Sequence, residues 1–210
     1  QKAVELARAW PFLYAAVGWH PEDCAPYAPE SLDELRALAR EPKVVAIGEI
    51  GLDYYWKENP PRELQQRVLR DQLALAEELD LPVIVHDRDA HGDCLSIVKE
   101  FPRVRGVFHC YSGSVEMARE LVELGWMISF TGVLTYPNAR KAVEVVQAVP
   151  SDRLMVETDS PYMAPVPFRG KRCHSGLVRY TCERMAELKG LSPEEMARIT
   201  YENGRRFFRI

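Results

Sequence analysis

Long hydrophobic runs are missing from this sequence of 210 residues. None of its apolar segments approaches the roughly 18 to 20 consecutive residues that cross a bilayer, so membrane-spanning proteins are excluded as a class. Residues 1–8 have the pattern of a helix and lack the basic and apolar segments of a secretory leader. We therefore expect the protein in the cytoplasm.

Closely spaced cysteine pairs are missing as well. The sequence contains five cysteines, an odd number, and none of them forms a C-x-x-C motif. This spacing argues against both a disulfide framework and a zinc ribbon. We expect reduced thiols that behave mostly as small buried apolar groups. They are Cys24, Cys94, Cys110, Cys173 and Cys182.

An excess of positive charge is missing too, since the formal net charge is −4. Proteins that coat nucleic acid through a broad electrostatic surface are usually basic, so this class is disfavoured. An enzyme that contacts phosphates through bound metal and a few arginines remains compatible with this charge. The content of 47% hydrophobic and 28% charged residues is ordinary for a globular domain.

Six short apolar segments alternate with helical patterns along the chain. Their apolar character is nearly continuous, which is typical of strands buried on both faces of a parallel sheet. The predicted strands are residues 12–18, 43–48, 82–86, 105–109, 126–130 and 153–157. Helices are predicted at residues 31–40, 61–79, 114–124, 138–149 and 177–189, and from Ser192 onward, where start signals or amphipathic periodicity occur.

This alternation predicts an α/β fold, either a doubly wound sheet or a barrel. The glycine-rich turn that follows the first strand of a Rossmann-type sheet is absent, so we favour a TIM-type barrel. No repeat or linker divides the sequence, and we predict a single domain over residues 1–210. In such a barrel the residues that carry the chemistry should follow the strands, at their carboxyl ends.

Histidines and carboxylates do follow five of the six predicted strands. Each one alone has an ordinary structural explanation, such as a turn or a hydrogen-bonded surface histidine. Together they indicate a divalent metal site, because imidazole nitrogens and carboxylate oxygens from different strands are typical ligands of catalytic metals. The residues are His20, Glu49, His86, His109 and Asp159.

The segments around these residues resemble the TatD family of metal-dependent deoxyribonucleases, which have amidohydrolase-type barrels. The similar segments are AAVGWHPED, AIGEIGLDYYW, PVIVHDRDAHGD, GVFHCYSG, ISFTG and VETDSPYMAP. They are long, and the resemblance extends over essentially the whole chain. It implies hydrolysis of phosphodiester bonds in DNA, as a 3′-5′ exonuclease acting on single strands or 3′ ends.

The resemblance also implies a ligand set for two divalent ions, Mg²⁺, Mn²⁺ or Zn²⁺. Glu49 would bridge the two ions, and His86 and His109 would complete the second ion's shell. Asp159 would bind the first ion and act as the general base on the attacking water.

Substrate phosphate contacts are predicted for His20, Arg88, Arg169 and Arg172. Arginine suits bidentate contact with phosphate. The alternative for Arg169 and Arg172, which flank Lys171, is a solvated loop cluster. The aromatic run of residues 54–56 suits either stacking on an unpaired base or ordinary packing, and packing is favoured.

The sequence departs from the family at its start, because it has no H-x-H motif to bind the first metal. Residue 1 falls in what resembles the helix before the family's third strand, so we expect a truncated barrel of about six strands that lacks roughly 40 residues and its first two strands. Such a chain is expected to hold one ion in place of two. Two alternatives remain open: a metal-dependent hydrolase of a small ester or amide, and a catalytically silent fragment.

Overall fold

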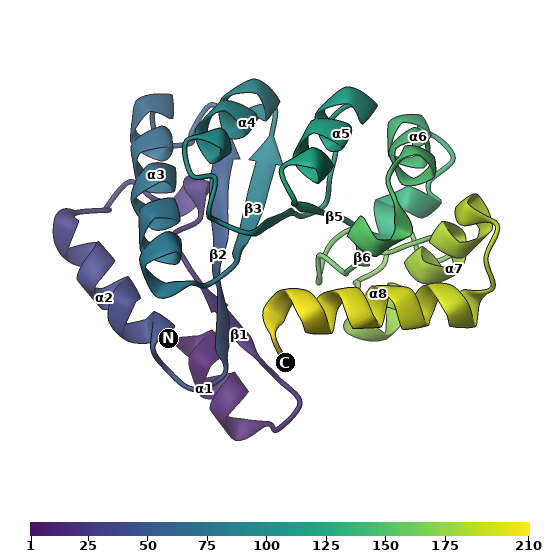
Figure 1. Ribbon diagram of the computed structural model, residues 1–210, viewed down its shortest axis with the longest axis horizontal. Coiled ribbons are helices and arrows are strands. Elements are labelled where there is room, and N and C mark those ends of the chain that lie inside the picture. Colours follow the sequence, from purple (N-terminus) through teal and green to yellow (C-terminus); the bar gives the residue numbers. More distant parts are fainter. The chain divides into compact units, whose positions relative to one another are not determined.

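The computed structural model describes residues 1–210 and contains eight α-helices and six strands (Figure 1). The strands are β1 (Ala15–Val17), β2 (Val44–Asp53), β3 (Val83–Arg88), β4 (Gly106–Phe108), β5 (Met127–Phe130) and β6 (Leu154–Val156). Their order in the sheet follows the chain, and the pairings β1–β2, β2–β3 and β5–β6 are parallel. All six predicted strands are confirmed.

The end of β2 differs from the prediction. The apolar run suggested a strand that stops at Gly48, whereas β2 continues to Asp53, so that Glu49 lies within the strand and not after it. Two glycines interrupt the apolar pattern here, and glycine is a weak strand former. Pairing with β3 nevertheless carries the strand through, with Gly51 opposite His86 and Asp53 opposite Arg88.

The helices are α1 (Lys2–Ala9), α2 (Pro29–Ala39), α3 (Arg62–Leu79), α4 (His91–Lys99), α5 (Val115–Glu123), α6 (Arg140–Ala148), α7 (Val178–Lys189) and α8 (Pro193–Phe208). None of them is both long enough and apolar enough to cross a membrane. The prediction omitted α4, which begins after Ala90 without a side-chain cap and so carries no start signal in its sequence.

Serines mark the starts of three helices. Ser114 and Ser192 are N-caps as predicted, and their hydroxyls accept hydrogen bonds from the amides of Met117 and Glu195 at 3.2 and 3.1 Å. The predicted start of α2 at Ser31 is wrong, because the helix begins at Pro29. The Ser31 hydroxyl instead reaches back and accepts a hydrogen bond from the amide of Ala28 at 3.1 Å.

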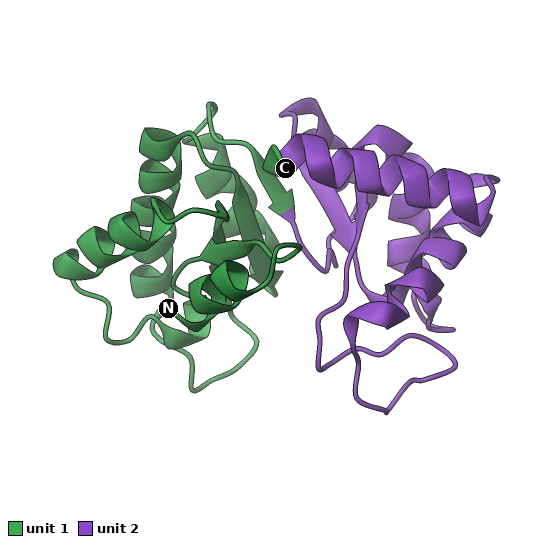
Figure 2. Cartoon of the chain, turned by 90° about the horizontal axis from the view of Figure 1, so that it is seen from below, with its two compact units in different colours: residues 1–107, 208–210 green, residues 108–207 purple.

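The chain divides into two compact units, coloured separately in Figure 2. Unit 1 comprises residues 1–107 and 208–210, and unit 2 comprises residues 108–207. The boundary falls within β4. The single domain over residues 1–210 stays a prediction.

Each unit has its own apolar core. In unit 1, α3 packs against β2, and the core includes the fully buried Ile47, Leu52, Leu73 and Val85. The fully buried core side chains of unit 2 include Leu121, Ile128, Val145 and Met185. All five cysteines are free, and four of them are buried, which confirms the prediction of reduced, mostly buried thiols.

Candidate metal centre

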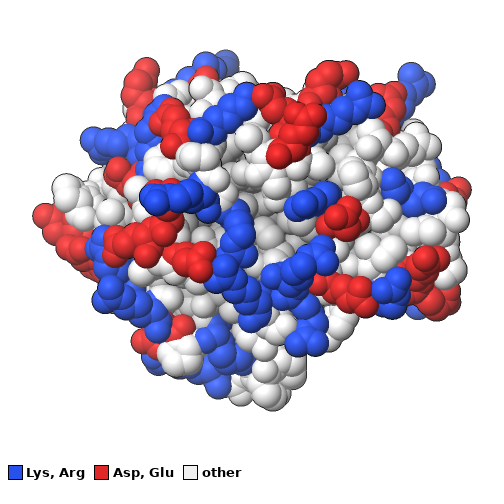
Figure 3. Space-filling view, in the orientation of Figure 1, with Lys and Arg blue, Asp and Glu red and all other residues white.

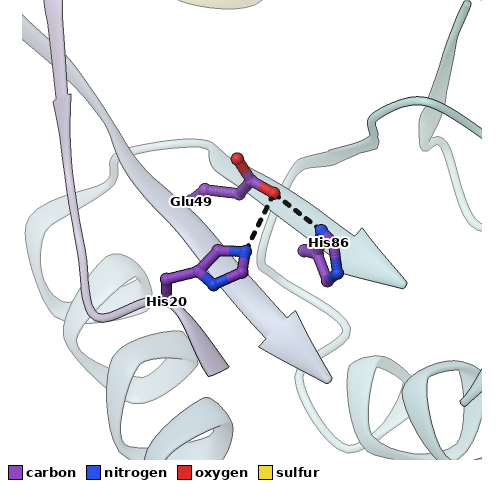
Figure 4. A group of neighbouring side chains, drawn as sticks. All are labelled: His20, Glu49 and His86. Atoms are coloured by element: carbon purple, nitrogen blue, oxygen red, sulfur yellow. Dashed lines mark hydrogen bonds and ion pairs between the residues drawn. The ribbon is translucent and has the colours of Figure 1, made fainter. Parts of the chain in front are cut away.

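A carboxylate and two imidazoles meet in unit 1 (Figure 4). The Oε1 atom of Glu49 lies 2.8 Å from Nδ1 of His86 and 3.4 Å from Nε2 of His20. The two imidazole rings lie edge to face, with centroids 4.6 Å apart. One potential ligand atom from each of the three residues lies within 4.8 Å of the others. Two neutral nitrogens and a carboxylate oxygen at this spacing fit a divalent cation.

The backbone of β2 and β3 positions Glu49 and His86. The parallel register between these strands is interrupted between Ile47 and Ile50, which is where Glu49 lies. Beyond this interruption, Gly51 pairs with His86 and allows the backbones of β2 and β3 to approach closely. Its φ is +143°, and a Cβ atom there would overlap the carbonyl oxygen of His86. Only glycine fits this position, which explains the second glycine of the GEIGLD segment.

His20 reaches the cluster from η1 (Pro21–Asp23), the short 3₁₀ helix that it caps. Its Nδ1 accepts a hydrogen bond from the amide of Glu22 at 3.3 Å, which leaves Nε2 to face Glu49. The side chain of Gln72 holds the preceding residue in place by bonding both the amide and the carbonyl of Trp19, at 2.7 and 3.1 Å. Hydrogen bonds therefore hold both the backbone before His20 and the Nδ1 side of its ring.

Burial and charge act in opposite directions on His20. Burial alone would lower its pKa, but the hydrogen bond and negative charge of Glu49 oppose this effect, and the acidic residues of η1 add to them. The net result is a pKa above the ordinary value for histidine. The Glu49 carboxylate thus stabilises positive charge placed next to it.

Asp53 completes the support of His86 and was missed by the sequence analysis. Its side chain is fully buried, and Oδ2 lies 3.0 Å from Nε2 of His86. Its Oδ1 accepts hydrogen bonds from the amide of Tyr55 and from the side chain of Asn59, both at 2.9 Å. The carboxylate therefore holds one imidazole nitrogen while the other faces Glu49, an arrangement that commonly orients metal-binding histidines. The available signal was an aspartate at the end of the strand that carries Glu49.

Unit 2 contains the other two predicted ligands, His109 and Asp159. His109 follows β4, and its Nδ1 lies 3.5 Å from Oε2 of Glu157. Glu157 also accepts a hydrogen bond from the amide of Cys110 at 2.6 Å. The backbone carbonyl of Asp159 accepts a hydrogen bond from the amide of Tyr162 at 2.7 Å. Glu157 was not predicted as a site residue, although it stands two positions before Asp159.

The structure thus brings Glu49 and His86 together in one unit and places His109 and Asp159 in the other. The four-residue ligand set stays a prediction. His20, predicted as a phosphate contact, lies against Glu49 and offers Nε2 as a further donor atom.

The predicted phosphate-binding arginines stack on aromatic rings or lie in solvent. The guanidinium carbon of Arg88 lies 3.9 Å from the ring centroid of Tyr55, and that of Arg169 lies 4.3 Å from the centroid of Tyr136. Arg172 is exposed. The face drawn in Figure 3 shows basic and acidic side chains interspersed, as the small net charge leads one to expect.

Comparison with known proteins identifies the family. The sequence matches the family model described as TatD related DNase over residues 1–209. It is 47% identical over 211 residues to the uncharacterized metal-dependent hydrolase YabD of Bacillus subtilis, covering 100% of this chain and 82% of that protein. It is 34% identical over 217 residues to the 3'-5' ssDNA/RNA exonuclease TatD of Salmonella typhimurium, covering 100% and 83%.

A solved structure agrees with this assignment. YJJV, a TatD homologue from Escherichia coli K12, superposes with a TM-score of 0.92 at 35% identity, covering 100% of this chain and 82% of that one. This similarity confirms the predicted α/β fold of the TIM-barrel type, with six of its strands present. The chain therefore belongs to the TatD family and is a metal-dependent hydrolase of that family.

Proposed function

We propose that this protein hydrolyses phosphodiester bonds of DNA, removing nucleotides from the 3′ end of single strands. The observation that carries the proposal is the convergence of Glu49, His86 and His20, which provides donors suited to a divalent ion. The relative from Salmonella typhimurium, named as a 3'-5' ssDNA/RNA exonuclease, supports this substrate class over a small ester or amide.

Glu49 and His86 would hold the ion in unit 1, with His20 as a further donor. A bound Mg²⁺, Mn²⁺ or Zn²⁺ would lower the pKa of a bound water and offset negative charge on the phosphate. Asp53 keeps His86 in the orientation that faces Glu49. These assignments require only side chains that already lie within contact distance of one another.

The remaining roles are assigned to unit 2. His109 would supply a further imidazole ligand, and a carboxylate oxygen of Asp159 would accept the proton of the attacking water. Arg169 and Arg172 would bind the phosphates of the substrate strand. The five free thiols favour a reducing compartment, so we propose the cytoplasm as the site of action.

The test is hydrolysis of a single-stranded dodecamer of thymidylate, labelled at its 5′ end, in the presence of Mn²⁺. We expect a ladder of products that shortens one nucleotide at a time from the 3′ end, and no products when EDTA is added. Glu49→Gln removes the charge of the side chain at nearly constant shape. Loss of a residue that only supports a metal ligand lowers activity by up to about 100-fold, so loss of the ligand itself is expected to lower the rate at least that much.

The matched control is Glu183→Gln on the exposed surface of α7, which is expected to cleave at the wild-type rate. Hydrolysis of a nitrophenyl ester without any cleavage of the oligonucleotide would reject the proposal and favour a small-molecule hydrolase. Cleavage of neither substrate by a folded, metal-loaded chain would also reject the proposed nuclease activity.

A further inference from the structure

Two exposed aromatic rings and one arginine lie next to each other at the ends of β2 and β3. The rings of Tyr55 and Trp56 meet edge to face at 4.7 Å, and each residue is 49% exposed. The guanidinium carbon of Arg88 lies 3.9 Å from the centroid of Tyr55 and 5.4 Å from that of Trp56. We refer to Tyr55, Trp56 and Arg88 as the aromatic platform.

The neighbouring Tyr54 differs from the platform residues because its side chain is held by several contacts. Its hydroxyl donates to Asp93 at 2.8 Å and accepts from Gln66 at 2.9 Å, and Arg62 covers its ring at 4.2 Å. The hydroxyl of Tyr55 and the indole N–H of Trp56 make no such bonds, and both residues remain about half exposed although Arg88 lies over the Tyr55 ring. The favoured packing interpretation of the aromatic run thus fits Tyr54 most fully, and stacking on a base stays a prediction for Tyr55 and Trp56.

The platform is attached to the candidate metal centre through the backbone of unit 1. The amide of Tyr55 donates to Asp53, whose other carboxylate oxygen faces His86. Arg88 stands two residues after His86 in β3 and pairs with Asp53 in the strand register. A substrate bound on the platform would thus be held by the same strand ends that carry the metal ligands.

We propose that the aromatic platform binds an unpaired base and the adjoining phosphate of a single-stranded nucleic acid. This proposal rests on the proposed function and adds a site for the substrate strand. Every base presents a π face, so an exposed indole or phenol ring stacks on it with little sequence preference. Arg88 makes no ion pair with a carboxylate, and its charge is available to a phosphate. Bases in a duplex are already stacked and paired, so the platform selects single strands.

The test compares two dodecamers that carry the same number of phosphates, one of thymidylate and one built from abasic residues. Binding is measured by fluorescence anisotropy with the full chain in EDTA, which prevents hydrolysis. We expect the wild type to prefer the thymidylate strand. Trp56→Ala should weaken binding of that strand by roughly 5- to 150-fold and bring the ratio of the two affinities close to one.

Two further variants separate stacking from charge and from folding. Trp56→Phe keeps an aromatic face and should restore most of the preference for the thymidylate strand. Arg88→Ala should weaken binding of both strands and reduce the slope of log affinity against log salt by about 0.7, the value for one phosphate contact on a single strand. The matched control is Tyr201→Ala, which removes a 65% exposed ring stacked near Arg205 in α8 and should change neither ratio nor slope.

The proposed platform would be rejected if the wild type bound both strands equally. It would also be rejected if Trp56→Ala left the ratio of the two affinities unchanged. These outcomes are independent of the hydrolysis assay. If the protein cleaves the thymidylate strand but Trp56→Ala leaves the affinity ratio unchanged, the platform is rejected and the proposed nuclease activity is retained. A base preference that depends on Trp56 without any cleavage would support the platform and reject the nuclease.

Discussion

The two units of the molecule hold their acid and base groups in different ways. In unit 1, the imidazoles of His20 and His86 meet the carboxylate of Glu49. The fully buried Asp53 contacts the other nitrogen of the His86 ring. In unit 2, His109 approaches Glu157 only to 3.5 Å, and both residues follow strands of three residues. The supporting strands in unit 1 have ten and six residues.

The difference reflects how strongly the backbone constrains each group. His86 lies in the β2–β3 ladder opposite Gly51, and Glu49 lies between two paired segments of β2, so neighbouring strand pairs restrict the backbone at both positions. His109 and Asp159 lie beyond the ends of their strands, in segments with fewer such constraints. Sites built on strands are positioned more precisely than sites on loops. We infer that the cluster of unit 1 is the more preorganised of the two groups of residues.

The largest expected effect comes from removing the central carboxylate of unit 1. In a calorimetric titration with Mn²⁺ we expect the wild type to bind, and Glu49→Ala to show no measurable binding. Asp159→Ala in unit 2 should still bind the ion held by unit 1 while losing roughly 10²- to 10⁴-fold in hydrolysis, as expected for a general base. If Glu49→Ala bound Mn²⁺ like the wild type, the metal would lie elsewhere and the comparison would fail.

The cores of the two units should behave alike even though their sites differ. Leu73 in α3 and Leu121 in α5 are both 0% exposed. Each Leu→Ala substitution should therefore lower the free energy of unfolding by about 2 to 5 kcal/mol, through lost burial and the cavity left behind. Urea denaturation followed by circular dichroism measures the change. A loss below about 1 kcal/mol in one unit would mean that its core is not close-packed.

A smaller effect is expected from the support behind His86. Asp53→Asn keeps the shape of the side chain but removes its charge, and should weaken Mn²⁺ binding by about 10- to 100-fold. Asp71→Asn is the matched control in the same unit, since this carboxylate accepts a hydrogen bond from Tyr27 at 3.2 Å and does not contact the cluster. An equal loss in Glu157→Gln of unit 2 would contradict the inference that the cluster of unit 1 holds the ion.

The smallest effect concerns helix starts, where the units also differ. Serines cap α5 and α8 in unit 2, whereas α3 and α4 in unit 1 begin without a side-chain cap, as do α6 and α7 in unit 2. Ser114→Ala should cost about 1 kcal/mol of stability, and Ser114→Gly only a few tenths. Thermal unfolding of both variants measures the difference. Equal costs for alanine and glycine would mean that the serine hydroxyl contributes little to the cap.

Hydrophobic periodicity and capping or turn residues predicted most of the elements, but the start of α2 was placed at Ser31 in place of Pro29, and two further features were missed. The apolar runs identified all six strands, because parallel strands buried on both faces leave a clear pattern. The extension of β2 past Gly48 and the helix α4 escaped detection. In the first case a neighbouring strand stabilises a segment with two glycines, and in the second a helix starts without a cap. Contacts between distant residues decide both, and local patterns do not report them.

The sequence by itself determined which residues were candidates for the chemistry, since histidines and carboxylates near the carboxyl ends of buried parallel strands are expected on the same edge of a sheet. It also determined the family, through long segments with specific spacing. Only the tertiary structure decided that Asp53 holds His86, that His20 faces Glu49, and that Trp56 is exposed while Tyr54 is fixed. The physical reason is that the three contacts join residues that lie 29 to 39 positions apart in the chain, while the exposure of Trp56 and Tyr54 differs although they are near neighbours. Such contacts depend on register and packing, which the order of residues encodes only through the folded chain.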